Sequence, residues 1–171
     1  MIDLKKWLWL FPFIGGFIVI ISFMFPAAFF FESTPSYSTE FFRWMLDFYY
    51  SHTYSGGIHT YTIHQSTSLT GWISIISSSF VILSNIFILI TANRYRKGNF
   101  NPKYYCLIVA LLTISITIGW MIMKEITTLN SFDHSFWGLL SPHFGIIGPF
   151  IGAGLEITGF LLLRKQREQS I

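Results

Sequence analysis

Four long runs of apolar residues alternate with polar segments along the chain and predict its main elements. They cover residues 7–31, 72–92, 104–123 and 143–163. An α-helix rises about 1.5 Å per residue, so about 20 apolar residues cross a hydrocarbon core of about 30 Å. We therefore expect four transmembrane helices. The remaining segments are an outer loop at 32–70, an inner loop at 93–103, a second outer loop at 124–142 and a tail at 164–171.

The first apolar run has some features of a secretory signal peptide. Lys5 and Lys6 precede it, and Ala27 and Ala28 lie near its end. The apolar core of a signal peptide is about 7–15 residues long, which is shorter than this run, and bulky phenylalanines surround the alanines. We therefore expect residues 7–31 to be a retained first span.

Composition agrees with lipid as the main surroundings of the chain. Of its 171 residues, 52% are apolar and only 11% are charged, whereas about a quarter of the residues of a soluble domain are charged. This balance excludes a soluble enzyme and a nucleic-acid-binding protein. The single cysteine, Cys106, excludes a disulfide-stapled secreted module. The expected fold is an all-α membrane protein, a four-helix transmembrane bundle that forms one domain over residues 1–171.

The positions of lysine and arginine predict the orientation, because these residues stay on the cytoplasmic side during insertion. Only Arg43 and Lys124 fall in the outer loops. The other basic residues lie at the inner ends of the spans: Lys5, Lys6, Arg94, Arg96, Lys97, Lys103, Arg164, Lys165 and Arg167. We therefore expect a multi-pass protein of the cell membrane with both termini in the cytoplasm. The lipid bilayer accounts for the basic character without nucleic acid as a partner.

Residues 40–51 of the first outer loop are expected to form a short amphipathic helix at the membrane interface. Glu40, Arg43, Asp47 and Ser51 are spaced by three, four and four positions, and the residues between them are mostly aromatic. On a helix these polar residues would form one narrow stripe. Such a helix would lie on the membrane or cap the bundle, with Arg43 pairing with Glu40 and Asp47.

Residues 52–64 repeat the tripeptide His-Thr-Tyr on either side of Gly56 and Gly57. β-Branched and aromatic residues around a Gly-Gly pair are typical of a β-hairpin. We expect a small two-stranded sheet here, which would rest on the aromatic helix or on the second outer loop because an isolated hairpin is marginal in water.

All five histidines fall on the predicted outer side. His52, His59 and His64 share the first outer loop, His134 lies in the second, and His143 begins the fourth span. Imidazole suits zinc or copper, but positions 59 and 64 would lie on opposite faces of a strand and no metal-binding motif is present. The first four histidines are therefore a candidate outer metal site, against the simpler expectation of solvated or strand-pairing histidines and no cofactor.

Glu156 is the only ionisable residue deep inside a predicted span. A charge in lipid costs at least about 2.5–3.5 kcal/mol, so such a side chain turns toward protein. Gly148 and Gly152 share its helical face at intervals of four, and Gly145 and Gly159 extend that face by three residues at each end. The glycines predict a helix-packing seam that a second helix can approach closely.

Other polar residues are expected at the depth of Glu156. Asn85 and Thr113 lie at a similar distance from the nearest inner basic residues, and Ser84 borders Asn85. We expect an intramembrane polar layer of these four residues, with a hydrogen bond between a neutral Glu156 and Asn85. The layer would be either a clasp that sets helix register or a relay for protons or cations.

The predicted layout resembles that of the claudin and related tetraspan families, which have four spans, both ends inside and a longer first outer loop. Those families carry a Trp, a Gly-Leu-Trp sequence and two cysteines in the first outer loop. Here that loop has Trp44 and no cysteine, and the nearest similar sequence, Trp137-Gly138-Leu139-Leu140, lies in the second outer loop. The resemblance therefore concerns topology alone.

No catalytic motif is present in the sequence, so we expect a protein that is not an enzyme. The first hypothesis is a tetraspan protein that presents an aromatic and histidine-containing outer surface, as an adhesion or scaffold component or as an accessory subunit of a membrane complex. Its partners would be lipid, other membrane subunits or a second copy. The alternative is a small transporter or channel subunit that uses Glu156 and the polar face of the second span.

Overall fold

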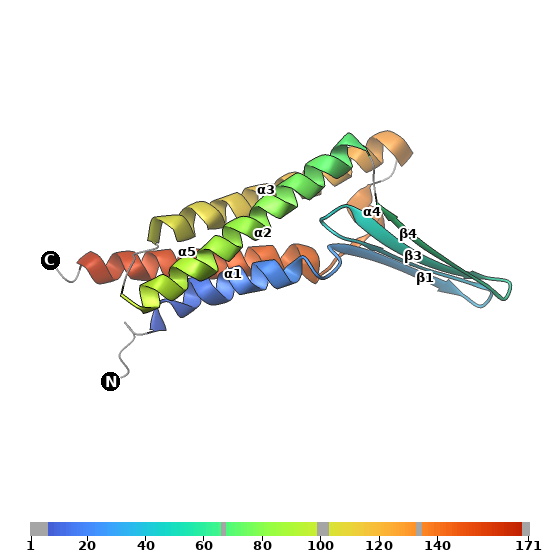
Figure 1. Cartoon of the computed structure of the whole chain (residues 1–171). Coiled ribbons are helices and arrows are strands. Elements are labelled where there is room, and N and C mark those ends of the chain that lie inside the picture. The colour runs from blue at the N-terminus through green and yellow to red at the C-terminus, as the bar shows by residue number, and fades with distance from the viewer. Residues whose placement is uncertain (1–6, 66–67, 99–102, 133–134, 169–171) are drawn as a thin grey trace. The chain divides into compact units, whose positions relative to one another are not determined.

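A computed structural model describes residues 7–65, 68–98, 103–132 and 135–168. Its elements follow one another along the chain as Figure 1 shows. They are α1 (Leu10–Ser22), β1 (Ala28–Thr34), β2 (Tyr37–Arg43), β3 (Phe48–Ser55), β4 (Ile58–Gln65), α2 (Leu69–Arg96), α3 (Lys103–Phe132), α4 (Phe136–Leu139), β5 (Ser141–Pro142) and α5 (Phe144–Glu168).

The chain folds into two compact units. The first, here the helical unit, consists of Met1–Ile21, Phe80–Ile116 and Gly148–Ile171. The second, the sheet unit, consists of Ser22–Ser79 and Thr117–Ile147. Helices α2, α3 and α5 contribute residues to both units.

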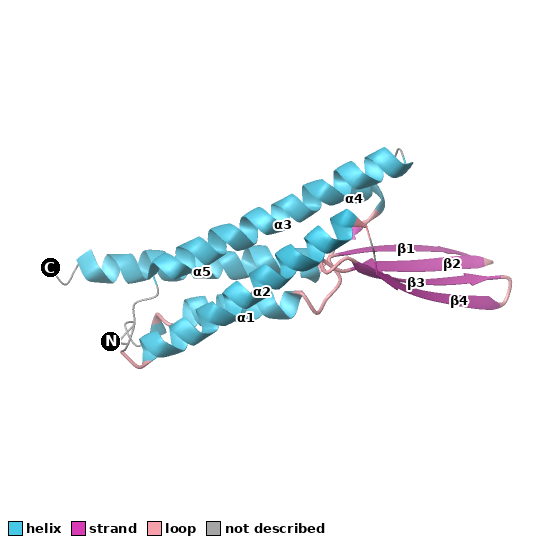
Figure 2. Cartoon of the chain, turned by 45° about the horizontal axis from the view of Figure 1, so that its top comes forward, coloured by secondary structure: helices cyan, strands magenta, loops and turns pink. Residues whose placement is uncertain are grey.

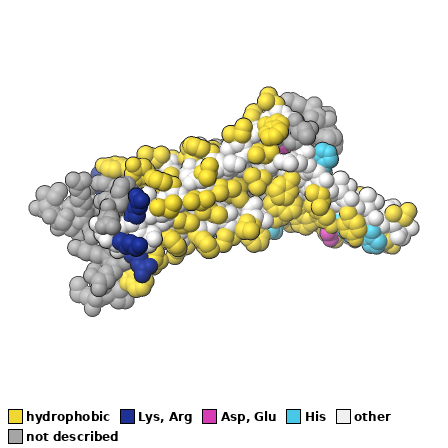
Figure 3. Space-filling model, in the orientation of Figure 1, with side chains coloured by type: hydrophobic (Ala, Val, Ile, Leu, Met, Phe, Trp, Pro, Cys, Tyr) yellow, Lys and Arg dark blue, Asp and Glu magenta, His cyan; other side chains and the backbone are white. Residues whose placement is uncertain are grey.

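Within the part of the chain that the structure describes, three helices are long and apolar enough to cross a membrane, over Leu69–Arg96, Tyr104–Leu129 and Phe144–Lys165. The protein is therefore a helical membrane protein. Large apolar side chains such as Ile76 and Leu83 remain 67% and 64% exposed on α2. Figure 3 shows hydrophobic side chains spread over the helices, with lysine and arginine gathered at the end of the helical unit where α2 finishes.

The predicted span at 7–31 implied one continuous helix. The first apolar run instead forms two separate elements. Helix α1 ends at Ser22, and β1 begins at Ala28. Pro26 lies between them and lacks the backbone N–H that a continuing helix would use. Beyond it, three consecutive phenylalanines favour a strand.

The helical unit packs closely along α1. A Cβ atom added at Gly15 would lie 2.6 Å from the carbonyl oxygen of Gly152, so the two backbones are in direct contact at this point. Elsewhere in the unit Ile88, Cys106 and Phe160 belong to a buried apolar cluster between α2, α3 and α5. Small residues therefore set the spacing of α1 and α5, and larger ones fill the rest of the core.

The sheet unit contains one five-stranded sheet of order β4-β3-β2-β1-β5, and every neighbouring pair is antiparallel. Figure 2 shows strands β1, β2, β3 and β4 side by side. Strand β5 pairs only with Ala28 and Phe29 of β1. The first and second predicted outer loops thus contribute to a single sheet. The expectation of an all-α fold is wrong, and the sheet is larger than the two-stranded one that was expected.

The helix expected at residues 40–51 is also wrong, because this segment forms most of β2, a turn and the start of β3. The three-and-four spacing of polar residues is compatible with a helix, but the intervening aromatic residues favour strands. Asp47, at the end of the turn, has a φ of +60°, which a continuous right-handed helix cannot accommodate. Trp44 donates its backbone N–H to the carbonyl of Phe48 at 3.0 Å and closes the turn.

Candidate functional site

The β3–β4 hairpin forms one edge of the sheet. Its turn contains Gly56 and Gly57, whose φ angles of +57° and +87° favour glycine. An antiparallel ladder between Phe48–Ser55 and Ile58–Gln65 follows the turn without a bulge. The hairpin predicted from the Gly-Gly pair is therefore present, as two strands of the larger sheet.

Strand β4 is an open edge. It pairs with β3 on one side, and no described strand pairs with its other side. All of its residues are exposed, including Ile58 at 70%, Tyr61 at 62% and Ile63 at 77%. Proteins usually protect such an edge with charged residues, proline or bulges, and β4 contains no charged residue and no proline. It therefore offers unpaired backbone groups and apolar side chains to another chain.

Histidine and tyrosine side chains cluster on one face of the sheet. The strand register places Glu40, His52 and Tyr61 in one row and Tyr54 and His59 in the next. The rings of His52 and Tyr61 are stacked with their centroids 4.5 Å apart, and those of His59 and Tyr54 are 4.9 Å apart. His52 and His59, two of the candidate metal ligands predicted from the sequence, are thus neighbours.

The predicted ligand His64 does not join this pair. His64 is on the opposite face of β4 from His59 and stacks on Tyr49, with the ring centroids 5.5 Å apart. His134, the fourth candidate ligand, lies outside the described residues. His143, which was not one of the four candidates, packs edge-on against Phe29. Within the described ranges, no group of three or more His, Cys, Asp or Glu side chains is arranged to hold a metal ion.

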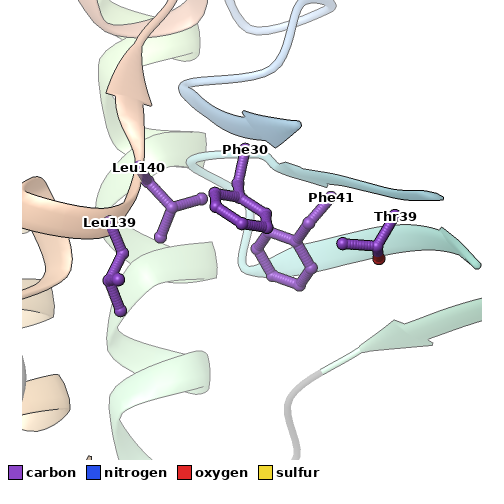
Figure 4. Close-up of a pocket in the computed structure, with 5 residues that line it drawn as sticks. All are labelled: Phe30, Thr39, Phe41, Leu139 and Leu140. Carbon is purple, nitrogen blue, oxygen red and sulfur yellow. The ribbon is translucent and has the colours of Figure 1, made fainter. Parts of the chain in front are cut away.

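The opposite face of the sheet carries an apolar hollow of about 290 Å³. Phe30 and Phe41 are a cross-strand pair of β1 and β2 and form its floor, with Thr39 beside them. Leu139 and Leu140, at the end of α4, close one side (Figure 4). The lining offers one hydroxyl and is otherwise carbon, so it suits an apolar group.

A buried ion cluster attaches the β2–β3 turn to helix α3. Nζ of Lys124 donates to Oδ1 of Asp47 at 2.5 Å, and Nη2 of Arg43 donates to the same oxygen at 2.6 Å. The side chains of Asp47 and Lys124 are only 1% and 3% exposed. Nζ of Lys124 also lies 5.6 Å from the ring centroid of Trp120, within the range of a cation–π contact.

The cluster carries more positive than negative charge. Burial by itself raises the pKa of Asp47, but the charges and hydrogen bonds of Arg43 and Lys124 outweigh that effect and hold the pKa below its ordinary 3.8. Oδ2 of Asp47 is buried and has no hydrogen-bond partner among the described residues. Asp47 therefore stays ionised and binds both cations through one oxygen.

Sequence reasoning found only part of this cluster. It paired Arg43 with Asp47 as helical neighbours, and the two do form an ion pair, although across a turn between strands. For Lys124 the sequence predicts only a basic residue on the outer side. The position of Lys124 in the sequence is the signal that could have indicated this ion pair. A lysine far from the inner basic groups and beside a long apolar run needs a specific anionic partner.

The predicted polar layer is divided into separate contacts. Nδ2 of Asn85 donates to Oγ1 of Thr113 at 3.2 Å and to the carbonyl of Val81 at 2.9 Å. Ser84 donates to the carbonyl of Phe80, in its own helix, at 2.8 Å. Asn85 and Thr113 are thus brought together, and Ser84 hydrogen-bonds outside this pair.

The predicted hydrogen bond between Glu156 and Asn85 is wrong. The side chain of Glu156 is fully buried, and neither carboxyl oxygen has a hydrogen-bond partner among the described residues. Helix α1 lies against both residues. A Cβ added at Gly15 would lie 3.0 Å from Cγ of Glu156, and one at Gly16 would lie 3.2 Å from the carbonyl oxygen of Asn85.

Two of the four glycines of the predicted seam face α1 directly. A Cβ at Gly152 would lie 2.5 Å from a methyl carbon of Val19, and one at Gly159 would lie 2.8 Å from Cδ of Pro12. Gly148 is buried in the same helix.

The remaining glycine of the seam, Gly145, belongs to the sheet unit. Its backbone N–H donates to the carbonyl of Pro26 at 2.9 Å. A Cβ there would lie 2.5 Å from that carbonyl oxygen. This glycine therefore contacts the segment between α1 and β1.

Comparison with known proteins assigns no family: no family model matches the chain, and no curated protein matches its sequence. The features of the molecule that point to a function are therefore the open edge of β4, the histidine face and the buried carboxyl groups.

Proposed function

We propose that the chain is a tetraspan protein of the cell membrane that docks to another chain through the open edge of its sheet. In this role it is an adhesion or scaffold component, or an accessory subunit of a membrane complex. The observation that carries the proposal is β4, an uncharged strand that is exposed along its whole length. The partner is another membrane protein or a second copy of the chain.

Strand addition is the recognition mode that β4 supports. A partner strand would pair with the free backbone groups of β4, and the alternating side chains would supply specificity. The side chains of Ile58, Tyr61 and Ile63 add exposed apolar area for a partner to cover. The buried ion cluster supports this use, because it attaches the β2–β3 turn to α3 and gives a docked partner a firm base.

We also propose that α1 makes a fourth crossing, with both termini in the cytoplasm. Its 13 residues rise about 20 Å, which is shorter than a hydrocarbon core of about 30 Å. Met24 and Phe25 extend the apolar surface past its end, with exposed fractions of 77% and 44%. Local thinning of the bilayer accommodates a mismatch of this kind. The orientation follows from the basic residues, most of which adjoin one end of the spans.

Thiol labelling in intact cells tests the orientation. Ser55→Cys places a thiol beside the exposed β3–β4 turn, whereas the native Cys106 is buried. A membrane-impermeant maleimide is expected to label this variant, and a tag placed after Ile171 is expected to be reached only after permeabilisation. Reaction of both from the same side would contradict the proposed topology.

The docking function is tested by the mass of the protein purified in mild detergent. Native mass spectrometry of the wild type is expected to show the chain with a second copy or another protein. Ile63→Lys introduces a charge on the open edge and is expected to release that partner. A wild type that purifies as a single chain at all concentrations would contradict the proposal.

Ser38→Lys is the matched control for the edge variant. Ser38 lies on β2, which is paired with strands on both sides, so its backbone is not available to a partner. This variant adds the same charge to the same sheet and is expected to retain the partner. Equal loss in both variants would show that charge on the sheet, rather than the β4 edge, controls association.

The second candidate function is a transporter or channel subunit, and one observation favours it. Glu156 is a fully buried carboxyl group in the helical unit with no hydrogen-bond partner among the described residues. Intramembrane carboxyl groups of this kind often mark ion or proton pathways. The docking function is preferred because Asn85 and Thr113, two other members of the predicted polar layer, bond to each other and neither residue titrates.

A further inference from the structure

The imidazole rings of His52 and His59 face each other across two adjacent strands. His52 Nε2 and His59 Nδ1 are 3.2 Å apart. The ring planes are parallel within 6°, and the ring centroids are 5.4 Å apart. The distance between the two nitrogens and the centroid-to-nitrogen distance within each ring together account for the distance between the centroids. Both nitrogens therefore lie on the line between the centroids, and the rings meet edge to edge. The lone pair of one nitrogen is therefore directed at the other.

This separation suits two ligands of one metal ion. Zinc binds histidine nitrogen at about 2.0–2.1 Å, and two such bonds at a tetrahedral angle place the nitrogens roughly 3.3 Å apart. The hydrogen bond that the two histidines now share would give way to the ion once both rings turn so that their lone pairs converge on it. Strand pairing already holds both residues on one face of the sheet, so little ordering is needed.

A metal-binding histidine also needs a group that sets which of its nitrogens carries the proton, and Glu40 is in position to do this for His52. Its Oε2 lies 3.9 Å from Nδ1 of His52, the nitrogen that does not face His59. A carboxylate behind a histidine holds the proton on the distant nitrogen and leaves the lone pair of the near one free for the metal. The 3.9 Å separation is longer than a hydrogen bond, so Glu40 acts on His52 through its negative charge. That charge favours a proton on Nδ1, which leaves Nε2 of His52 free to bind a metal.

We propose that His52 and His59 together bind one divalent transition-metal ion of the zinc and copper class, with Glu40 as the positioning residue. Borderline metals of this class prefer imidazole nitrogen, whereas calcium and magnesium prefer oxygen. No third His, Cys, Asp or Glu ligand joins them among the described residues, so water fills the remaining positions. The site is consequently open on the exposed face of the sheet and adjoins the β4 edge.

The stacked tyrosines make the pair a rigid one. The ring of Tyr61 lies against His52 and the ring of Tyr54 lies against His59. These contacts restrict the side-chain rotations that would otherwise separate the two nitrogens. His64 has a similar contact with Tyr49 but faces the other side of β4, where it has no histidine neighbour in the strand register.

Calorimetric titration of the full-length chain in detergent with zinc chloride, repeated with copper chloride, tests the proposal. The wild type is expected to bind one ion. His52→Asn and His59→Asn are each expected to weaken binding at least tenfold, whereas His64→Asn, the matched control on the same strand, is expected to bind as the wild type does. Circular dichroism of each variant shows whether the sheet is retained.

Glu40→Gln tests the positioning role. Loss of such a partner weakens metal binding by about 10–100-fold, and this variant is expected to do so with the stoichiometry unchanged. Binding that is absent in the wild type, or that is unaffected in folded His52→Asn and His59→Asn, would overturn the metal site. Binding that depends on both histidines but not on Glu40 would overturn the positioning role alone. None of these results depends on the presence of a docking partner.

Discussion

The carboxylate of Asp47 accepts a hydrogen bond from Nζ of Lys124 at 2.5 Å, although 77 positions separate the two residues. Asp47 closes the β2–β3 turn, and Lys124 lies in helix α3. Both side chains are almost completely buried. The contact therefore joins the first predicted outer segment to an apolar helix and helps to hold the sheet within its unit.

Removal of the lysine is expected to destabilise the sheet unit. Loss of one member of a buried ion pair costs about 3–5 kcal/mol, and Lys124→Met is expected near the lower end because Arg43 still pairs with Asp47. Thermal unfolding in detergent measures the effect. Lys97→Met, at an exposed position, is the control and is expected to leave the unfolding temperature unchanged.

The double variant Asp47→Asn with Lys124→Met separates the ion pair from simple packing. Because it leaves no uncompensated charge from this pair, its loss of stability is expected to be smaller than the sum of the two single losses. Additive losses would show that the two side chains do not interact in the folded protein.

Acid is expected to weaken the same contact. The pKa of Asp47 is lower in the folded protein than its ordinary 3.8, so the stabilisation is complete above that value and is lost as the pH falls through the folded pKa. The unfolding temperature of the wild type is expected to fall more between about pH 5 and about pH 3 than that of Asp47→Asn. An identical acid response in the two proteins would contradict this assignment.

The close contact of α1 and α5 predicts different results for two glycines. A methyl group at Gly15 would lie 2.6 Å from the carbonyl oxygen of Gly152, whereas one at Gly154 has nothing within 4 Å. Gly15→Ala is expected to lower the free energy of unfolding by about 1–3 kcal/mol through overpacking. Gly154→Ala is expected to be neutral or slightly stabilising. Comparable losses in both variants would argue against a close contact specific to Gly15.

Glu156→Gln distinguishes the two proposed functions. The amide has nearly the shape of the carboxyl group, and no hydrogen bond to a described residue is lost. Under the docking function, folding and the mass of the purified complex are expected to stay unchanged. Under the transport function, cation or proton flux into proteoliposomes would be present in the wild type and lost in the variant. Such a loss in a folded variant would favour transport.

The elements that were predictable are those set by neighbouring residues. The Gly56-Gly57 pair predicts a hairpin because only a few turn types accept those φ angles, and β3 and β4 follow from it. The helices at α2, α3 and α5 follow from uninterrupted apolar runs. The pairing of Arg43 with Asp47 was found for the wrong reason, since a helix and a short turn both bring residues four apart together.

Other features depend on residues that are distant in the chain. Residues 40–51 are aromatic enough for either a buried helix face or a strand. Strand pairing selects the strand, because β2 pairs with β1 and β3, and β3 also pairs with β4. Glu156 and Asn85 were correctly expected to be buried. Their separation could not be inferred from depth alone, because it depends on where α1 packs.

Local patterns of residues in the sequence thus determined that this is a helical membrane protein with a hairpin outside the long apolar runs. They could do so because periodicity, run length and turn glycines act over a few residues. Tertiary structure alone decided that the outer segments share one sheet, that Lys124 meets Asp47 and that His52 meets His59. Strand register and side-chain burial are joint properties of segments far apart in the chain, and no single segment contains them.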